Sequence, residues 1–168
     1  MKRPACPPPL PPKLILFVVL RVLNSGDFRA CEGIVSFADF TLGPEVGPVL
    51  DEHIRLSDRF RGIRHAAGWD ASDRIRNSHT HPPQSLFLRE DFQAGFQELA
   101  NRDLTFDAWL YHPQISDVTT LAKMFPDTTI IFDHFGGPLG IGPYANQGDL
   151  VFDEWAASVA ELAKCANV

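Results

Sequence analysis

The stretch "LTFDAWLYHPQISDVTTLAKMFPDTTIIFDHF", residues 104–135, places a helical pattern between two strand-like runs. Residues 104–112 and 128–135 are rich in β-branched and aromatic residues, which is typical of strands. Between them, Ser116 is a candidate helix cap. The apolar side chains that follow at helical spacing are Val118, Leu121, Ala122 and Phe125. A strand, a helix and a second strand in this order predict a βα unit on a parallel sheet.

The same alternation continues toward the amino terminus. "GIVSFADF" (33–40) and "RFRGIRHAAGW" (59–69) indicate two earlier strands, and apolar stripes at helical spacing indicate three more helices. The stripes are Val46, Val49, Leu50 and Ile54; Phe92, Phe96, Leu99 and Ala100; and Trp155, Val159, Leu162 and Ala163. Strand and helix alternate four times without a hairpin signal, so we predict the α/β class. An open sheet and a barrel share this local pattern, and periodicity leaves both open.

Composition and charge fit one globular domain. The chain has 168 residues, 45% hydrophobic and 21% charged, which is enough to bury a core. The net charge of −6 has no blocks of like sign, which argues against nucleic acid or a membrane as partner. Three cysteines lie far apart without a CxxC pair. We therefore expect a reducing, cytoplasmic location.

The first 29 residues differ from the rest. "MKRPACPPPLPPK" (1–13) is too rich in proline for a helix or a central strand. The apolar run "LILFVVL" (14–20) is shorter than the roughly 20 residues that span a bilayer. A basic start before an apolar run resembles a signal peptide, but prolines intervene and no A-x-A site follows. We expect a strand or a non-native start here, and divide the chain into residues 1–29 and a domain of residues 30–168.

Polar and ionisable residues gather at the predicted strand exits. In parallel βα folds, sites lie at the carboxyl ends of the strands. The residues at these ends are Asp39, Arg61, Arg64, His65, Tyr111, His112, Gln114, Asp133 and His134. His134 leaves an apolar strand over the expected cleft and is the candidate catalytic residue. Its neighbour Asp133 points to the opposite side and is expected to pair with the backbone or a neighbouring strand.

Two arginines and two aromatic residues are candidate substrate-binding residues. Arg61 and Arg64 are three residues apart, so they face opposite sides of a strand unless a bulge intervenes. A guanidinium at the site can bind a carboxylate with two hydrogen bonds, and the alternative is a surface ion pair. For Tyr111 and His112, the alternative is a polar strand exit that Pro113 ends.

Two further motifs have weaker interpretations. "NSHTHPP" (77–83) contains His79 and His81, a spacing that suits a metal when a rigid strand aims both side chains to one face. Two prolines follow, so we predict a loop instead, with a lid over the site as a special case. The glycines of "FGGPLGIGPYA" (135–145) match neither phosphate-loop pattern and predict a tight loop. No GxSxG motif occurs, so nucleophilic triad chemistry has no support.

Four motifs together resemble the amidohydrolase-related family. They are "GIVSFADFTLG", "RFRGIRHAAGWD", "FDAWLYHPQ" and "IIFDHFGGPLGIGPYA", and they occur in the family's order. These barrel hydrolases include 2-pyrone-4,6-dicarboxylate hydrolase, sulfomuconolactone hydrolase and sugar lactonases. The resemblance runs from about residue 30 to 168. It implies an incomplete (β/α)8 TIM barrel of about four βα units. A barrel of this kind is like those of metal-dependent hydrolases.

The resemblance also implies roles for individual residues. The family site uses an HxH pair on the first strand, a mid-barrel histidine and a late aspartate. The mid-barrel histidine corresponds to His134, which would be catalytic and a metal ligand. Arg61 and Arg64 would bind substrate carboxylates, with Tyr111 near the substrate. Residues 1–29 contain no histidine, so the ligands that would join His134 are absent.

The implied function is hydrolysis of a lactone, or a similar C–O or C–N bond, in a small carboxylated substrate. The implied cofactor is a divalent zinc or manganese ion, or none, because some relatives with this pattern work without a metal. One alternative is a catalytically incomplete fragment. Half a barrel leaves open sheet edges, which a second copy or a complementing chain would cover. Another alternative is a decarboxylase of the same superfamily.

Overall fold

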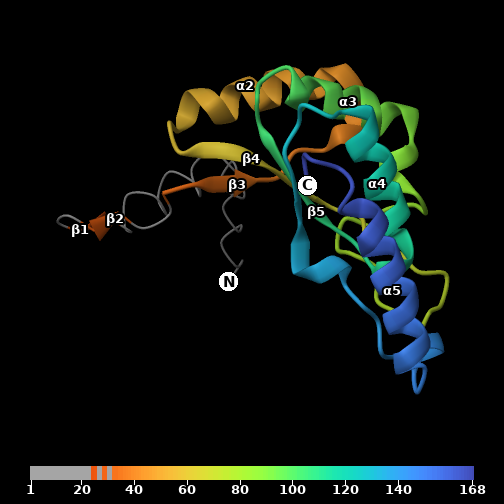
Figure 1. The fold of residues 1–168 in the computed structure, drawn as a ribbon. Coiled ribbons are helices and arrows are strands. Elements are labelled where there is room, and N and C mark those ends of the chain that lie inside the picture. The colour runs from red at the N-terminus through yellow and green to blue at the C-terminus, as the bar shows by residue number, and fades with distance from the viewer. Residues whose placement is uncertain (1–23, 26–27, 30–31) are drawn as a thin grey trace, which may run out of the picture.

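The computed structural model describes residues 24–25, 28–29 and 32–168 (Figure 1). The predicted strand at 14–20 and the rest of the proline-rich segment lie outside the described residues. Two short strands, β1 (Asn24–Ser25) and β2 (Phe28–Arg29), pair antiparallel. All other described strands and helices belong to a single α/β unit, so the predicted fold class is confirmed.

The central sheet has four parallel strands in sequence order. They are β3 (Ile34–Ser36), β4 (Phe60–Ala66), β5 (Thr105–Trp109) and β6 (Ile130–Phe132). Each strand pairs with the next along the chain, and the order never reverses as it does in a doubly wound sheet. Figure 1 shows the helices as a curved layer along one side of these strands. This arrangement is that of a barrel wall.

The four predicted helices are present. They are α2 (Gly47–Leu56), α3 (Glu90–Ala100), α4 (Ile115–Met124) and α5 (Gly148–Leu162). Short 3₁₀ helices join them to the strands: η1 (Phe40–Val46), η2 (Leu86–Leu88), η3 (His112–Gln114), η4 (Asp133–Gly136) and η5 (Gly142–Tyr144). None of the described helices combines the length and the apolar character needed to cross a membrane.

The predicted cap of α4 is wrong by two residues. The helix begins at Ile115 with Gln114 at the N-cap position, and Ser116 lies in its first turn. The 3₁₀ helix η3 runs directly into α4, and the Ile115 N–H donates to the His112 carbonyl. The preceding turn therefore supplies a hydrogen-bond acceptor for a backbone N–H at the start of α4, as a capping side chain does in other helices.

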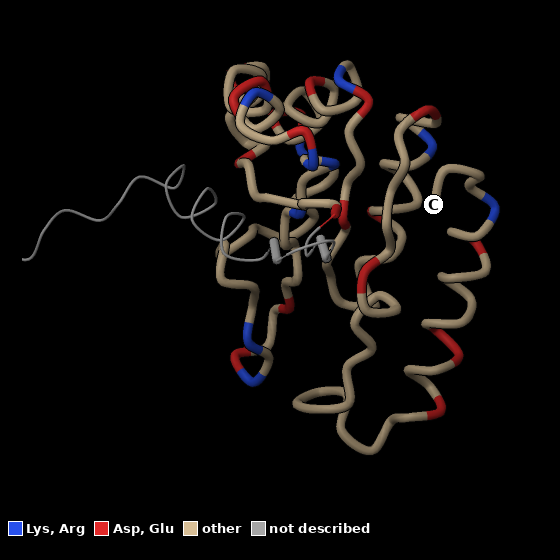
Figure 2. Tube along the Cα trace, turned by 90° about the vertical axis from the view of Figure 1, so that its left-hand side faces the viewer, with Lys and Arg blue, Asp and Glu red and all other residues tan. Residues whose placement is uncertain are grey.

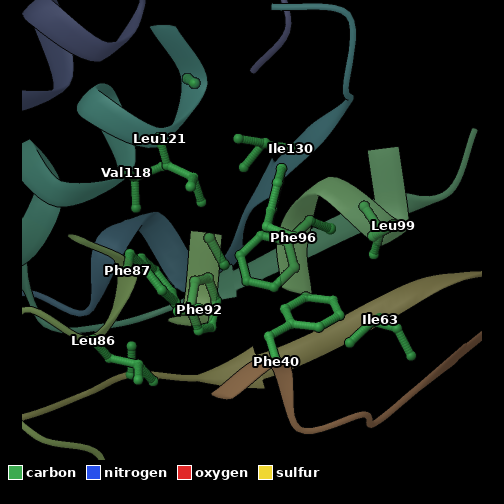
Figure 3. Packing of buried hydrophobic residues seen from close by; sticks show 14 of the residues in the cluster. Phe40, Ile63, Leu86, Phe87, Phe92, Phe96, Leu99, Val118, Leu121 and Ile130 are labelled. Carbon is green, nitrogen blue, oxygen red and sulfur yellow. The ribbon is translucent and has the colours of Figure 1, made fainter. Parts of the chain in front are cut away.

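Phenylalanine rings fill the space between the sheet and the helices (Figure 3). Phe96 and Phe106 lie with their ring centroids 5.1 Å apart in an edge-to-face arrangement, and Phe40 and Phe92 pack in the same way at 5.4 Å. A Cβ atom on Gly95 would lie 2.3 Å from the Phe40 carbonyl oxygen. Glycine at this position lets α3 pack directly against η1.

A bulge in β4 explains the order of buried and exposed residues along it. Ile34 pairs with Phe60, but Val35 pairs with Gly62, so Arg61 is an extra residue in β4. Phe60 and Ile63 are therefore both buried although they are three residues apart. The sequence analysis left undecided whether a bulge lies between Arg61 and Arg64. The structure has this bulge, and both arginines are exposed.

The sheet face away from the helices carries charge. Arg64 pairs in register with Asp107 of β5, which in turn pairs with Ile131 of β6. We call this the inner face, because it corresponds to the inside of a barrel.

Figure 2 shows charges of both signs dispersed along the described chain, without a long block of one sign.

Candidate functional site

The carboxyl ends of β4 and β5 border a cleft of about 360 Å³. Strand alternation sends Arg64 and Ala66 of β4, and Trp109 of β5, to the same face of the sheet. The cleft is lined by Arg64, Ala66, Arg76, Asn77, Ser78, His79, Trp109 and Tyr111. Among the described residues that line it, two are arginines and none is an aspartate or glutamate. We call this space the β4–β5 cleft.

The loop that follows β4 folds back over the strand ends. The Ser78 N–H donates to the Gly68 carbonyl at 2.8 Å, and the Thr80 hydroxyl donates to the Ala66 carbonyl at 2.8 Å. The Tyr111 hydroxyl donates to the Arg76 carbonyl from the neighbouring strand exit. The "NSHTHPP" stretch is thus a loop, as predicted, and it forms one wall of the β4–β5 cleft.

The two histidines of that loop lie in different surroundings. His79 lines the β4–β5 cleft, whereas His81 lines a separate cavity together with Asp39 and His65. His81 has a left-handed backbone with φ 49°. The loop conformation therefore does not give the two imidazoles the shared face that a strand would provide.

Gln114 ties the exits of β4 and β5 together. Its side-chain oxygen accepts from the Trp69 N–H at 2.9 Å and from the Tyr111 N–H at 3.4 Å. Its side-chain nitrogen donates to the Ala67 carbonyl at 2.9 Å. This buried amide fixes the backbone from which Tyr111 extends. Its role is structural.

Trp109 packs against the backbone of the same exit. A Cβ atom on Gly68 would lie 2.1 Å from Cζ3 of its indole ring. The Tyr111 ring lies edge-to-face with the indole at 5.2 Å. The two rings form an aromatic wall in the β4–β5 cleft, next to the arginines.

Arg64 lies between two buried carboxylates. Its Nη2 lies 3.4 Å from Oδ2 of Asp107, and its Nε lies 2.8 Å from Oδ2 of Asp133. The second pair is an ion pair without hydrogen-bond geometry, since Asp133 Oδ2 accepts no hydrogen bond from the described residues. Burial, followed by the charge of Asp133, raises the pKa of Asp107, while Arg64 opposes that rise. Asp133 was expected to pair with the backbone or a neighbouring strand, but this ion pair reaches β4, which lies one strand beyond the neighbouring β5.

Arg61 lies at the other end of β4. Its guanidinium donates to the carbonyls of Asp58 and Phe60, which precede it in the chain. Arg64 lies three positions further along the strand, which is roughly 10 Å. The structure therefore places only Arg64 of the two predicted arginines in the β4–β5 cleft.

His112 is buried beneath the glycine-rich loop. Its Nδ1 accepts from the Leu139 N–H at 3.3 Å, and its ring packs edge-to-face on Tyr144 at 5.0 Å. Burial lowers its pKa, so the imidazole is neutral. His112 is not among the residues that line the β4–β5 cleft, and its contacts hold the loop after β6.

His134 begins a left-handed turn at the end of β6. Residues 134–137 all have positive φ, with His134 at 49° and Phe135 at 55°. Non-glycine residues in this region carry about 1–3 kcal/mol of strain each, which clusters at functional sites. A Cβ atom on Gly137 would lie 2.4 Å from the Leu110 carbonyl oxygen. The glycines thus form the predicted tight loop, and the His134 side chain is exposed outside the β4–β5 cleft.

His65 points to the helix side of the sheet. It is only 4% exposed, its ring packs near Phe37 and Phe92, and its Nδ1 has no hydrogen-bond partner in the described chain. Burial lowers the pKa of His65 to about 4, against a smaller opposing effect of Asp39. It is a neutral core histidine at neutral pH.

A metal ion does not fit the described residues on their own. In the described part of the chain, no three histidine, cysteine, aspartate or glutamate side chains are placed to hold one. His134, the predicted ligand, is exposed and belongs to no such group of three among the described residues.

The sequence analysis did not single out Trp109 and Arg76, whose side chains form part of the cleft. Trp109 could have been found, because it alternates with Asp107 and Tyr111 along one strand. Arg76 had no such signal, because its position depends on how the loop folds back.

Comparisons with known proteins agree with this fold. A model of the amidohydrolase family matches residues 28–168. Uncharacterized protein y4mH of Sinorhizobium fredii is 35% identical over 136 residues, which are 81% of this chain and 42% of that protein. The chain therefore spans less than half of that relative.

Two crystal structures of an amidohydrolase from Burkholderia multivorans are similar to the chain. The structure with bound zinc aligns with a TM-score of 0.60 at 22% identity, and the alignment covers 82% of this chain and 42% of the Burkholderia chain. The structure with bound HEPES aligns with a TM-score of 0.64 at 21% identity, and that alignment covers 91% of this chain and 47% of the Burkholderia chain. At this identity the likeness shows the fold, and the predicted incomplete barrel is confirmed. With the family model matched over 28–168, the chain belongs to the amidohydrolase family.

Proposed function

We propose that the protein is a hydrolase that opens a lactone, or a similar cyclic ester, in a small carboxylated substrate. One observation carries this proposal. The β4–β5 cleft, at the strand ends where barrel enzymes place their sites, is lined by two guanidinium groups and, among the residues that the structure describes, by no carboxylate. Its volume of about 360 Å³ falls at the small end of the range for ligand pockets.

The cleft residues suit a flat ring that bears a carboxylate. The aromatic wall of Trp109 and Tyr111 offers ring faces and edges for stacking. Arginine binds carboxylates through two parallel hydrogen bonds. A small molecule of this type is the expected partner of the site, and a second copy or a complementing chain at the sheet edges is part of the same proposal.

His134 is the proposed catalytic residue. It directly follows Asp133, whose carboxylate reaches Arg64, so it extends from the same carboxyl edge of the sheet. In hydrolysis, water oxygen bonds to the ring carbonyl carbon, the ring C–O bond breaks, and the leaving alkoxide takes a proton. A histidine near the carbonyl can supply or accept that proton.

The proposal does not require zinc or manganese, and the activity assay tests each ion separately. The Burkholderia multivorans amidohydrolase binds zinc, but the described residues here do not form a metal site. No step of the proposal passes through a metal. Assays with and without each ion decide whether the activity needs one.

The test is turnover of a panel of carboxylated lactones by the purified full chain. His134→Asn should lower kcat/KM by about 10²-fold or more, as expected for loss of a general acid or base. His81→Asn is the matched control, because His81 is also exposed and shares the φ of 49°. Asparagine tolerates this backbone at both sites.

Three results would count against parts of this proposal. Equal activity in the two histidine variants would remove His134 from the mechanism. Absence of turnover with every lactone, with or without metal, would favour the incomplete fragment. Release of carbon dioxide from the same substrates would favour the decarboxylase.

A further inference from the structure

The two arginines of the β4–β5 cleft differ in their ionic partners. Arg64 has Asp107 at 3.4 Å and Asp133 at 2.8 Å, and those residues are 7% and 8% exposed. Arg76 lines the same cleft, is exposed, and forms no ion pair with the described residues. We propose that Arg76, and not Arg64, binds the carboxylate of the ligand, and that Tyr111 positions Arg76. This inference rests on the function proposed above and concerns the same β4–β5 cleft.

The charge around Arg64 argues against it as the anion-binding residue. Arg64 already lies against two buried carboxyl groups, Asp107 at 3.4 Å and Asp133 at 2.8 Å. A ligand carboxylate that approaches Arg64 therefore competes with these two groups for the guanidinium. Arg64 still has donors toward the cleft, because its side chain is 46% exposed. These donors suit a neutral oxygen of the ligand better than a carboxylate.

Arg76 has no such compensation. Asp70 acts on the Tyr111 phenol, as Arg76 does, but it forms no ion pair with Arg76, and its carboxylate accepts from the Tyr144 hydroxyl at 2.7 Å and the Ser72 N–H at 2.8 Å. The Arg76 charge is therefore available to a ligand. An uncompensated guanidinium beside an aromatic wall is a common recognition element for carboxylates.

Tyr111 fixes the backbone of Arg76. Its hydroxyl donates to the Arg76 carbonyl, across 35 residues of sequence. Burial raises the pKa of Tyr111, which keeps the phenol protonated and able to donate. On the other side of Arg76, the Asn77 side-chain oxygen accepts from the Asp70 N–H at 2.8 Å. The Arg76 side chain thus starts from a fixed point at the rim of the cleft.

The test uses the full chain and benzoate, a flat ring with one carboxylate, titrated by calorimetry in low-salt buffer. Arg76→Gln should weaken benzoate binding by about tenfold or more, the loss expected for a charge-assisted pair. Arg74→Gln is the matched control. It removes the same charge from the same loop at an exposed position outside the cleft lining, so binding should change less than about twofold.

Tyr111→Phe separates positioning from general structure. It keeps the ring and removes the hydroxyl, so benzoate should bind a few-fold more weakly. In an Arg76→Gln background the same change should have almost no effect, because the group that it positions is gone. Additive losses would mean that Tyr111 acts independently of Arg76. Thermal melting of each variant checks that the fold is retained.

The outcomes separate this inference from the proposed function. If wild-type protein does not bind benzoate, the carboxylate-binding cleft is wrong and both fall. If wild type binds but Arg76→Gln binds equally well, or Arg64→Gln loses more than Arg76→Gln, only the Arg76 assignment is overturned. If Arg76→Gln loses binding while no lactone is turned over, Arg76 stands and hydrolysis by this chain falls.

Discussion

On the helix side of the sheet, Phe106 packs among four phenylalanine rings whose centroids lie 5.1–6.1 Å away. On the inner face, the next residue of the same strand is Asp107, which faces Arg64. One face is filled by non-directional apolar packing, and the other carries charges that need specific partners. The comparison indicates that the helix side supplies most of the stability, so that the inner face can hold polar groups at some energetic cost.

Removing a ring from the helix side should have the largest effect. Phe106→Ala deletes a fully buried side chain from the aromatic core and should lower the free energy of unfolding by about 3–5 kcal/mol. Urea denaturation followed by circular dichroism measures the loss. Val35→Ala, on the inner face and 42% exposed in the wild type, is the control and should cost less than about 1 kcal/mol. Similar losses in the two variants would contradict the division of roles.

The buried histidine on the helix side should make stability depend on pH. His65 titrates near 4 in the folded protein and near 6.5 when unfolded, so the unfolded chain binds more protons between these values. Its contribution is complete above pH 6.5 and is lost as the pH falls toward 4, by up to about 3 kcal/mol. His65→Phe should flatten this part of the stability profile. An unchanged slope between pH 6.5 and 4 would show that other groups cause it.

On the inner face, Arg64→Ala should cost about 1–2 kcal/mol at pH 7. It leaves Asp107 and Asp133 buried without their cation, but the exposed half of the Arg64 side chain allows water to compensate in part. The cost should shrink at pH 4, because burial raises the pKa of Asp107 and this carboxyl group then takes up a proton more readily than an exposed one. Urea denaturation at the two pH values measures this. A cost that is equal at both would contradict the ionic account.

The smallest effect is expected at the amino end of β4. Arg61→Ala removes hydrogen bonds to two carbonyls at the surface, so stability should change by less than about 0.5 kcal/mol. Benzoate affinity should also stay within about twofold of wild type, because Arg61 lies roughly 10 Å along the strand from Arg64. A clear loss of affinity would restore the substrate-binding role that the family resemblance implied.

The strands and helices were predictable because their hydrophobic periods are local. Each apolar stripe specifies its own element, and four repeats of strand and helix specify the class. The direction of His65 was also accessible, since it alternates with Ile63 on the core side of β4. The contacts that could not be predicted from the sequence join residues far apart in the chain. The partners of Arg64 lie 43 and 69 residues away in sequence, and their pairing depends on the register of three strands.

The β4–β5 cleft shows the same limit. Arg76 enters it only because the loop after β4 is held to Ala66, Gly68 and Tyr111. Local propensity predicts that this segment is a loop but not which strand end it covers. The strand-end rule therefore predicted the edge of the sheet at which the cleft lies, while the arginine that forms no ion pair with the described residues could be identified only from the structure.

The Gln114 amide has a consequence for recognition kinetics. It joins the exits of β4 and β5 in one hydrogen-bonded unit, and the loop bonds to the same exits. Ordering a free loop on binding would cost about 1–2 kcal/mol for each backbone residue that becomes fixed. Here that cost is met during folding, so the cleft is preorganised for its ligand. Ligands of similar charge should consequently associate at similar rates and differ mainly in how long they remain bound.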